Sequence, residues 1–197
     1  MVIIRPARES DIPAFSEIYN HVILNTTAVY QYEAQTLEMR RAWYESKMKD
    51  GYPVFVAEED GKVVGFSSYG PFRAWAAYKY TVENSVYVAD GQRGKGIGRM
   101  LMQPVIDSAR SRGLHAIVSG IDASNDASVR LHEQFGFKEV AHFKEVGFKF
   151  GRWLDLEVSG VGAGWAGATG GWLGPCGVVG PNARFYLRLR ILHSLRP

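Results

Sequence analysis

A glycine-rich run, Gln92-Arg93-Gly94-Lys95-Gly96-Ile97-Gly98-Arg99, lies between a predicted strand and a predicted helix. Glycines leave backbone N–H groups uncovered, and at the start of a helix these groups and the helix dipole together favour an anion. The three glycines would let a diphosphate approach the main chain without meeting Cβ atoms, and the two arginines add positive charge. The run predicts a pyrophosphate-binding turn, with a generic glycine-rich turn as the alternative for the motif by itself.

Two familiar phosphate-binding motifs do not fit this run. A P-loop requires Ser or Thr directly after Gly-Lys, whereas Gly94-Lys95 is followed by Gly96. The spacing of the glycines also differs from the G-x-G-x-x-G pattern of a dinucleotide-binding fold. The predicted anion site is therefore neither a P-loop nor the glycine-rich turn of a dinucleotide-binding fold.

The segment 93–98 matches the pattern R/Q-x-x-G-x-G/A, which marks the GNAT superfamily of N-acetyltransferases. Asn125 ahead of a helix and the segment 131–137, which is similar to the family's L-Y/H-x-x-x-G-F, extend the resemblance to about residues 2–157. It implies an α/β (α+β) GNAT fold, with a mixed, mostly antiparallel twisted sheet of six to seven strands flanked by about four helices. It also implies acetyl-CoA as the co-substrate and no metal.

Two further segments, 81–88 and 148–155, resemble one branch of the family, the phosphinothricin and methionine sulfoximine acetyltransferases. This resemblance implies that the α-amine of a small amino-acid-like substrate is acetylated, such as phosphinothricin, methionine sulfoximine or methionine sulfone. Relatives in this branch are commonly dimers, so the resemblance also implies a homodimer, although the sequence pattern itself does not show the oligomeric state.

N-acetylation requires a base, because only a neutral amine attacks a thioester. The resemblance assigns this role to Glu83, with an exposed strand carboxylate as the alternative, and assigns the oxyanion donor to a backbone N–H near Val88. His132 stands where many relatives have a tyrosine that protonates the departing thiolate. An imidazole could do this near neutral pH, and a structural histidine is an equal alternative.

Binding roles follow from the same resemblance. Arg73 would pair with the substrate's carboxylate or phosphinate, and Tyr78 and Tyr87 would form walls of the pocket. Asn125 and Ser128 could bind the pantetheine arm, although Asn before a helix is also an ordinary cap. The full set of expected acetyl-CoA contacts is Val86, Tyr87, Val88, Arg93, Gly94, Lys95, Gly96, Ile97, Gly98, Arg99, Asn125 and Ser128.

Hydrophobic periodicity predicts the elements that position these residues. Strands are expected at about 2–4, 54–57, 63–66, 81–88, 116–118, 137–143 and 153–158, with a hairpin at Asp60-Gly61. Helices are expected at about 11–24, 36–49, 97–112 and 126–135. Ser10-Asp11-Ile12-Pro13 is typical of an N-cap with proline in the first turn and would begin the first helix, and Thr36 would cap the second. The irregular segment 25–32 between the first two helices could line a site.

Composition separates a main domain, 1–157, from a Gly-rich linker-like segment, 158–182, and a basic tail, 183–197. From 158 onward there are four arginines and no Asp or Glu, so removing these from the formal net charge of +3 leaves −1 for residues 1–157. A main body without excess positive charge argues against nucleic-acid binding there. One cysteine, Cys176, excludes an internal disulfide, and the lack of a long apolar stretch argues for a cytoplasmic protein without membrane contact.

Three rival functions remain open at this stage. The cofactor motif does not specify the acceptor, so another amine, such as a protein N-terminus, a polyamine or an aminoglycoside, is the first. A non-catalytic acyl-CoA sensor is the second. The third is nucleic-acid binding through the tail, which would show an affinity that falls with salt and disappears on truncation near Val158.

Overall fold

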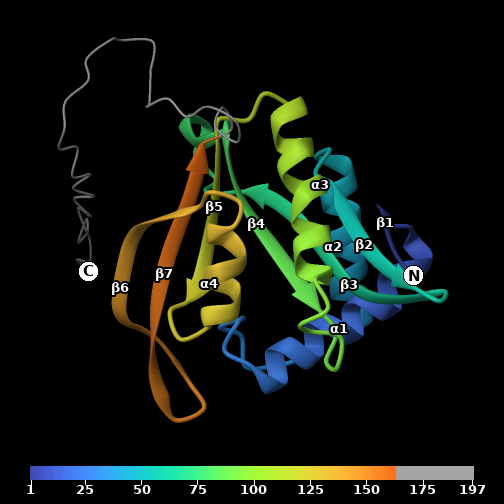
Figure 1. Ribbon diagram of the computed structural model, residues 1–197, viewed down its shortest axis with the longest axis horizontal. Helices are drawn as coiled ribbons and strands as arrows, with labels where there is room; N and C mark the ends of the chain where they lie inside the picture. The colour runs from blue at the N-terminus through green and yellow to red at the C-terminus, as the bar shows by residue number, and fades with distance from the viewer. Residues whose placement is uncertain (163–197) are drawn as a thin grey trace, which may run out of the picture. The chain divides into compact units, whose positions relative to one another are not determined.

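The computed structural model describes residues 1–162, and the tail and most of the Gly-rich segment lie outside the described residues. Seven strands form one sheet in the order β1-β2-β3-β4-β5-β7-β6 (Figure 1). Only the β4–β5 pair is parallel, so the expected mixed, mostly antiparallel sheet is confirmed. The strands are β1 (Val2–Pro6), β2 (Val54–Glu59), β3 (Lys62–Pro71), β4 (Thr81–Val88), β5 (Ala116–Asp122), β6 (Lys138–Lys149) and β7 (Arg152–Gly162).

Four α-helices cover the sheet within the described residues, as expected. They are α1 (Ile12–Asn25), α2 (Leu37–Lys49), α3 (Ile97–Ser111) and α4 (Asp126–Glu133), and two short 3₁₀ turns are η1 (Glu9–Asp11) and η2 (Ala76–Tyr78). Thr36 caps α2 by accepting a hydrogen bond from the backbone N–H of Met39, as its position before the helix predicts. Asp11, expected to cap α1, instead binds the guanidinium of Arg5 in a two-pronged ion pair.

Neighbouring residues of β3 show which helices cover which face of the sheet, because successive side chains of a strand point to opposite faces. Phe66 packs with Phe15 of α1 and Tyr44 of α2. A Cβ at the adjacent Gly65 would instead meet Leu101 of α3. The pair α1–α2 therefore covers one face, and α3 covers the other.

The β4–β5 pair is the feature of the sheet that matters for function. These strands are hydrogen-bonded only from Thr81 to Glu83 on β4 and from Ala116 to Val118 on β5, although β4 continues to Val88 and β5 to Asp122. The two strands therefore separate at their carboxyl ends. An opening in a sheet exposes backbone groups and side chains of both strands, which creates room for a ligand.

Strand β7 is longer than its apolar pattern predicts. It pairs with β5 as far as Gly162, so residues 158–162 of the predicted Gly-rich segment belong to the sheet. Small residues there do not prevent pairing, because the ladder is made by backbone groups. The Asp60-Gly61 hairpin between β2 and β3 is confirmed, with both residues at positive φ, 50° and 78°.

Candidate active site

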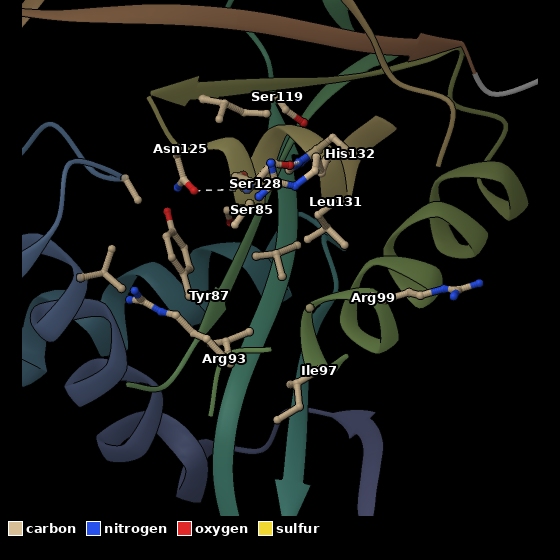
Figure 2. Close-up of a pocket in the computed structure, with 18 of the residues that line it drawn as sticks. Ser85, Tyr87, Arg93, Ile97, Arg99, Ser119, Asn125, Ser128, Leu131 and His132 are labelled. Atoms are coloured by element: carbon tan, nitrogen blue, oxygen red, sulfur yellow. Dashed lines mark hydrogen bonds between the residues drawn. The ribbon is translucent and has the colours of Figure 1, made fainter. Parts of the chain in front are cut away.

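A groove opens where β4 and β5 separate. Its volume is about 670 Å³, and its walls come from the carboxyl half of β4, the end of β5, the turn before α3, and α4 (Figure 2). Thr26 and Ala28, from the irregular segment after α1, close another side, as predicted for that segment. A volume in this range suits a large organic ligand.

The glycine-rich turn has the geometry that an anion site needs. Gly94 and Gly96 have φ of 79° and 78°, which L side chains rarely adopt, and a Cβ at either position would meet no atom within 4 Å. Both line the groove, and Gly96 caps the amino end of α3. The main chain is thus open to a ligand at the positive end of a helix dipole.

Gly98 lines the groove, as expected of an acetyl-CoA contact, and it also has a packing role. A Cβ there would lie 3.2 Å from Cδ2 of Leu131 on α4, so the small residue lets α3 and α4 pack closely. Lys95 does not line the groove, because its ammonium donates a hydrogen bond to Oε1 of Gln92, 2.6 Å away. Within the predicted anion-binding run, Gly94 and Gly96 provide the open backbone.

Both arginines of the glycine-rich run, Arg93 and Arg99, line the groove. In Figure 2 the Arg93 side chain extends along the Tyr87 side of the groove, whereas the Arg99 guanidinium extends away from the other labelled residues. The expected anion-binding charge is therefore most direct at Arg93. Together with the open glycine turn it fits the diphosphate of a CoA molecule.

The start of α4 forms the opposite wall. Oδ1 of Asn125 accepts a hydrogen bond of 3.2 Å from the backbone N–H of Ser128, which is the predicted cap. Both residues also line the groove, as do Val86, Tyr87, Val88 and Ile97. Eleven of the twelve expected acetyl-CoA contacts thus lie around one cavity, and Lys95 is the exception.

His132 is buried in the wall of the groove, on α4. Its Nδ1 lies 2.8 Å from the carbonyl of Ser128, an oxygen that only accepts, so Nδ1 carries the proton. Nε2 lies 3.2 Å from the amide of Asn84, which donates to it, and the Oδ1 of Asn84 accepts from the hydroxyl of Ser119. Burial lowers the pKa of His132, so the ring is neutral at physiological pH.

Glu83 stands at the point where β4 and β5 separate, in the last pair that the two strands make. Its Oε1 lies 3.4 Å from the position of a Cβ on Gly120 of β5. Desolvation raises the pKa of the Glu83 carboxyl, while the positive charges of Arg73 and Lys47 oppose that rise. A carboxyl with a raised pKa between two cations has the properties of a general base.

Arg73 and Tyr78 come from the loop between β3 and β4. The Arg73 guanidinium lies 4.3 Å from the ring centre of Phe72, and the Tyr78 ring packs edge-on against that same ring. Neither residue lines the groove, but the charge of Arg73 acts on Glu83. They therefore belong to the base end of the site rather than to the glycine-turn end.

Tyr87 lies deeper than an ordinary pocket wall. Its ring packs edge-on against Tyr19 of α1 at 5.2 Å and lies 5.1 Å from Phe66 of β3. Burial raises the pKa of its phenol, so the hydroxyl stays protonated. A rigid aromatic floor thus separates the groove from α1 and α2.

Several polar residues of the site have no motif signal in the sequence. Each is an ordinary residue type at an ordinary position, and only the tertiary fold brings it to the groove, to Glu83 or, for Arg40, to a smaller cavity that Tyr87 also lines. The missed residues are Arg40, Lys47, Asn84, Ser85, Ser119 and Asp122.

No helix within residues 1–162 is both long and apolar enough to span a membrane. The same residues contain no group of three or more His, Cys, Asp or Glu side chains arranged to hold a metal ion.

Comparison with known proteins agrees with this geometry. The model of the acetyltransferase (GNAT) family matches residues 15–137. An L-methionine sulfoximine/L-methionine sulfone acetyltransferase of Salmonella typhimurium is 48% identical over 153 residues, which cover 78% of this chain and 90% of the relative. A phosphinothricin N-acetyltransferase of Streptomyces coelicolor is 40% identical over 156 residues, covering 78% and 91%.

A solved structure shares the fold. The GNAT superfamily phosphinothricin acetyltransferase of Sinorhizobium meliloti, in complex with acetyl-CoA, superposes with a TM-score of 0.80 at 30% identity, covering 82% of this chain and 88% of that one. A family match over more than half of the chain, close relatives along most of their length and a shared fold all give the same answer. The chain therefore belongs to the GNAT family of acetyltransferases.

Proposed function

We propose that this protein transfers the acetyl group of acetyl-CoA to the α-amine of a small amino-acid-like acceptor, such as methionine sulfoximine, methionine sulfone or phosphinothricin. The observation that carries the proposal is the position of Glu83. This residue makes the last β4–β5 pair, directly before Asn84, the first β4 residue that lines the groove, and its carboxyl feels the charges of Arg73 and Lys47. Such a site offers a base for an ammonium and cations for acidic or polar oxygens. The names of the relatives support the same acceptor class.

Acetyl-CoA supplies an activated acetyl thioester, and the residues of the chain would do the rest. Gly94, Gly96 and Arg93 bind its diphosphate, while Asn125 and Ser128 face its pantetheine arm. Glu83 accepts the proton that the α-ammonium must lose, directly or through a water molecule. A backbone N–H near Val88, in the part of β4 that β5 leaves unpaired, donates to the developing oxyanion.

For His132 we propose the structural role rather than the proton-donating one. Its ring proton is held by the Ser128 carbonyl, and the other nitrogen accepts from Asn84. The ring therefore fixes the Asn84 amide, which in turn accepts a hydrogen bond from Ser119 on β5. This chain of hydrogen bonds links α4, β4 and β5 around the groove and would keep its width constant.

We also propose a homodimer, formed through the edge strand β6. Large apolar side chains on β6 and the turn into β7 are exposed, and Phe148 packs edge-on against Trp153, whose side chain is 59% exposed. An exposed apolar patch on an edge strand is typical of an interface. Sedimentation should show a dimer, and Trp153→Lys should shift it to monomer; an unchanged distribution would contradict this interface.

Free-thiol release from acetyl-CoA tests the proposed function. The acceptors are methionine sulfone, methionine sulfoximine, phosphinothricin, spermidine and a peptide amine, each with wild type, Glu83→Gln and the control Glu45→Gln. Glu45 is an exposed carboxylate on α2 outside the site. We expect turnover with the first three acceptors only, reduced by about 10²-fold or more in Glu83→Gln and unchanged in the control.

Other outcomes select the other functions. Turnover only with spermidine or the peptide would keep the acetyltransferase and replace the acceptor class. Tight binding of CoA without turnover on any of the amines would indicate an acyl-CoA sensor. Because the proposed reaction consumes acetyl-CoA, we also propose a cytoplasmic location, where this co-substrate is available.

A further inference from the structure

A second cavity lies on the far side of Tyr87 from the glycine turn. Its volume is about 170 Å³, and it is lined by residues of α1, α2, β3 and β4 and by Gln35, just before α2. Two residues of β4, Ser85 and Tyr87, line both this cavity and the large groove. The small cavity, which we call the Arg40 pocket, is therefore separated from the groove only by side chains of one strand.

Arg40 is the charged group of this pocket, and its side chain is only 2% exposed. One Nη donates a hydrogen bond of 2.7 Å to Oε1 of Gln35. Nε is buried without a hydrogen-bond partner, and within residues 1–162 no carboxylate forms an ion pair with this guanidinium. A buried cation without a counter-ion is costly, so a site that keeps one needs an anion to balance it.

The guanidinium is held in place by its neighbours. It stacks on the ring of Tyr19, with Cζ 3.7 Å from the ring centre, and lies 4.8 Å from the ring centre of Trp43. Gln35 is itself fixed, because Asn20 exchanges two hydrogen bonds of 2.8 Å with its backbone. Stacking and a fixed acceptor leave the free Nε edge at one orientation, which is the arrangement of a binding group.

Size and wall chemistry restrict the anion. A cavity of 170 Å³ holds a group of a few heavy atoms and excludes a nucleotide or a sugar phosphate. The hydroxyls of Ser85 and Tyr87 add hydrogen-bonding groups at the border with the groove. A carboxylate suits such a site, because two oxygens can meet a planar guanidinium edge.

We propose that the Arg40 pocket binds the α-carboxylate of the acceptor, and this inference rests on the proposed function. Glu83, Ser85 and Tyr87 alternate along β4 and so share one face of the strand. An α-amino acid carries its amine and its carboxylate on one carbon. The amine can therefore face Glu83 while the carboxylate passes Ser85 toward Arg40. Arg73, at the other end near the exposed loop, is then left for the side-chain oxygens of the acceptor.

The test compares two acceptors that differ only in the carboxylate: methionine sulfone and 3-(methylsulfonyl)propylamine. Each is assayed with wild type, Arg40→Met, Arg40→Lys and the control Arg41→Met, which removes an exposed arginine next in sequence. We expect Arg40→Met to lower kcat/KM for methionine sulfone by about 10- to 100-fold, mainly through KM, since a hydrogen-bonded charge pair is lost. The amine without a carboxylate should lose no more than about twofold, and Arg40→Lys should fall between.

An equal loss with both acceptors would overturn the inference, because it would make Arg40 a structural residue. If Arg40→Met does not fold, the same comparison with Arg40→Lys decides, since this variant keeps the charge but loses the planar edge. Failure of the proposed function gives a different result: wild type would then acetylate only amines without a carboxylate, and the inference would fall with it. If wild type acetylates methionine sulfone but the Arg40 variants lose the same activity with both acceptors, the inference is overturned and the proposed function stands.

Discussion

The ammonium of Lys47 lies over Gly70, the strand neighbour of Glu83. The ammonium of Lys47 donates a hydrogen bond of 2.7 Å to the carbonyl of Tyr69 and occupies the space that a Cβ on Gly70 would fill. Gly70 is the β3 residue paired with Glu83 on β4. Paired residues in an antiparallel ladder have neighbouring side-chain positions on one face. A half-buried lysine on α2 thus lies beside the proposed base, although its sequence position is that of an ordinary helix residue.

Lys47→Met should move the acidic limb of the pH–rate profile to higher pH. Desolvation raises the pKa of Glu83, and the charges of Lys47 and Arg73 hold that rise back. Removing the ammonium raises the pKa of Glu83 further, so a smaller fraction is carboxylate at a given acidic pH. Because burial lowers the pKa of Lys47 only to about 8, the lysine is charged over the whole acidic limb in wild type.

The measurement is kcat/KM for methionine sulfone from about pH 5 to pH 8. Lys49→Met is the matched control, since it removes an exposed lysine from the same helix. The control should have the wild-type profile. An unmoved acidic limb in Lys47→Met would show that Glu83 is not the group that titrates.

Gly96→Ala should raise the KM for acetyl-CoA by about tenfold, with kcat little changed. Gly96 has φ of 78° at the open end of α3, and alanine there costs about 1–2 kcal/mol or shifts the backbone that faces the diphosphate. Gly91→Ala is the control, because Gly91 has φ of 72°, has nothing within 4 Å, and does not line the groove. Both variants should lose similar stability, and only Gly96→Ala should bind acetyl-CoA more weakly. Equal KM values would contradict the role of the turn.

The fold was predictable because its signals are local. Alternating and helical apolar patterns, the Asp60-Gly61 turn and the Thr36 cap each depend on a few neighbouring residues. Asp11 shows where this fails, because a distant partner, Arg5, captures the side chain that would have capped α1. The predicted length of β7 was too short for a similar reason. Its last residues, ending at Gly162, are small and give no apolar pattern, and pairing with the distant strand β5 keeps them extended.

The candidate site was predictable at one end only. Gly94 and Gly96 act through backbone geometry that the run itself encodes, whereas the packing role of Gly98 could not be predicted from the run, because its neighbour, Leu131, lies on another helix. Arg40 and Lys47 could not be found from the sequence. Both are cations on a helix with a largely polar sequence, and Arg40 becomes buried and Lys47 half-buried only when α2 packs on the sheet.

Lys149→Met should destabilise the protein by about 2–4 kcal/mol and weaken the groove wall made by residues 26–28. The ammonium of Lys149 on β6 donates to three carbonyls, those of Ile23, Thr26 and Val29, at 2.6 to 2.8 Å. Methionine would fill the space but leave these buried acceptors without a donor. The check is chemical denaturation together with amide exchange of residues 24–30. Lys138→Met, on the exposed start of β6, should change neither the stability nor the exchange rates. Unchanged exchange in Lys149→Met would contradict the proposal that Lys149 holds this segment in place.

His132→Gln should separate the two roles of the histidine. Glutamine keeps a side-chain amide that can accept from Asn84, but it has no group that titrates near neutral pH. With the structural role, kcat should stay within about threefold of wild type, while His132→Phe, which removes the hydrogen bond, should lower both kcat and thermal stability. Both variants are assayed at saturating acetyl-CoA across the pH range. A loss of about 10²-fold or more in kcat for His132→Gln, with normal stability, would instead establish the ring as the acid that protonates the departing thiolate.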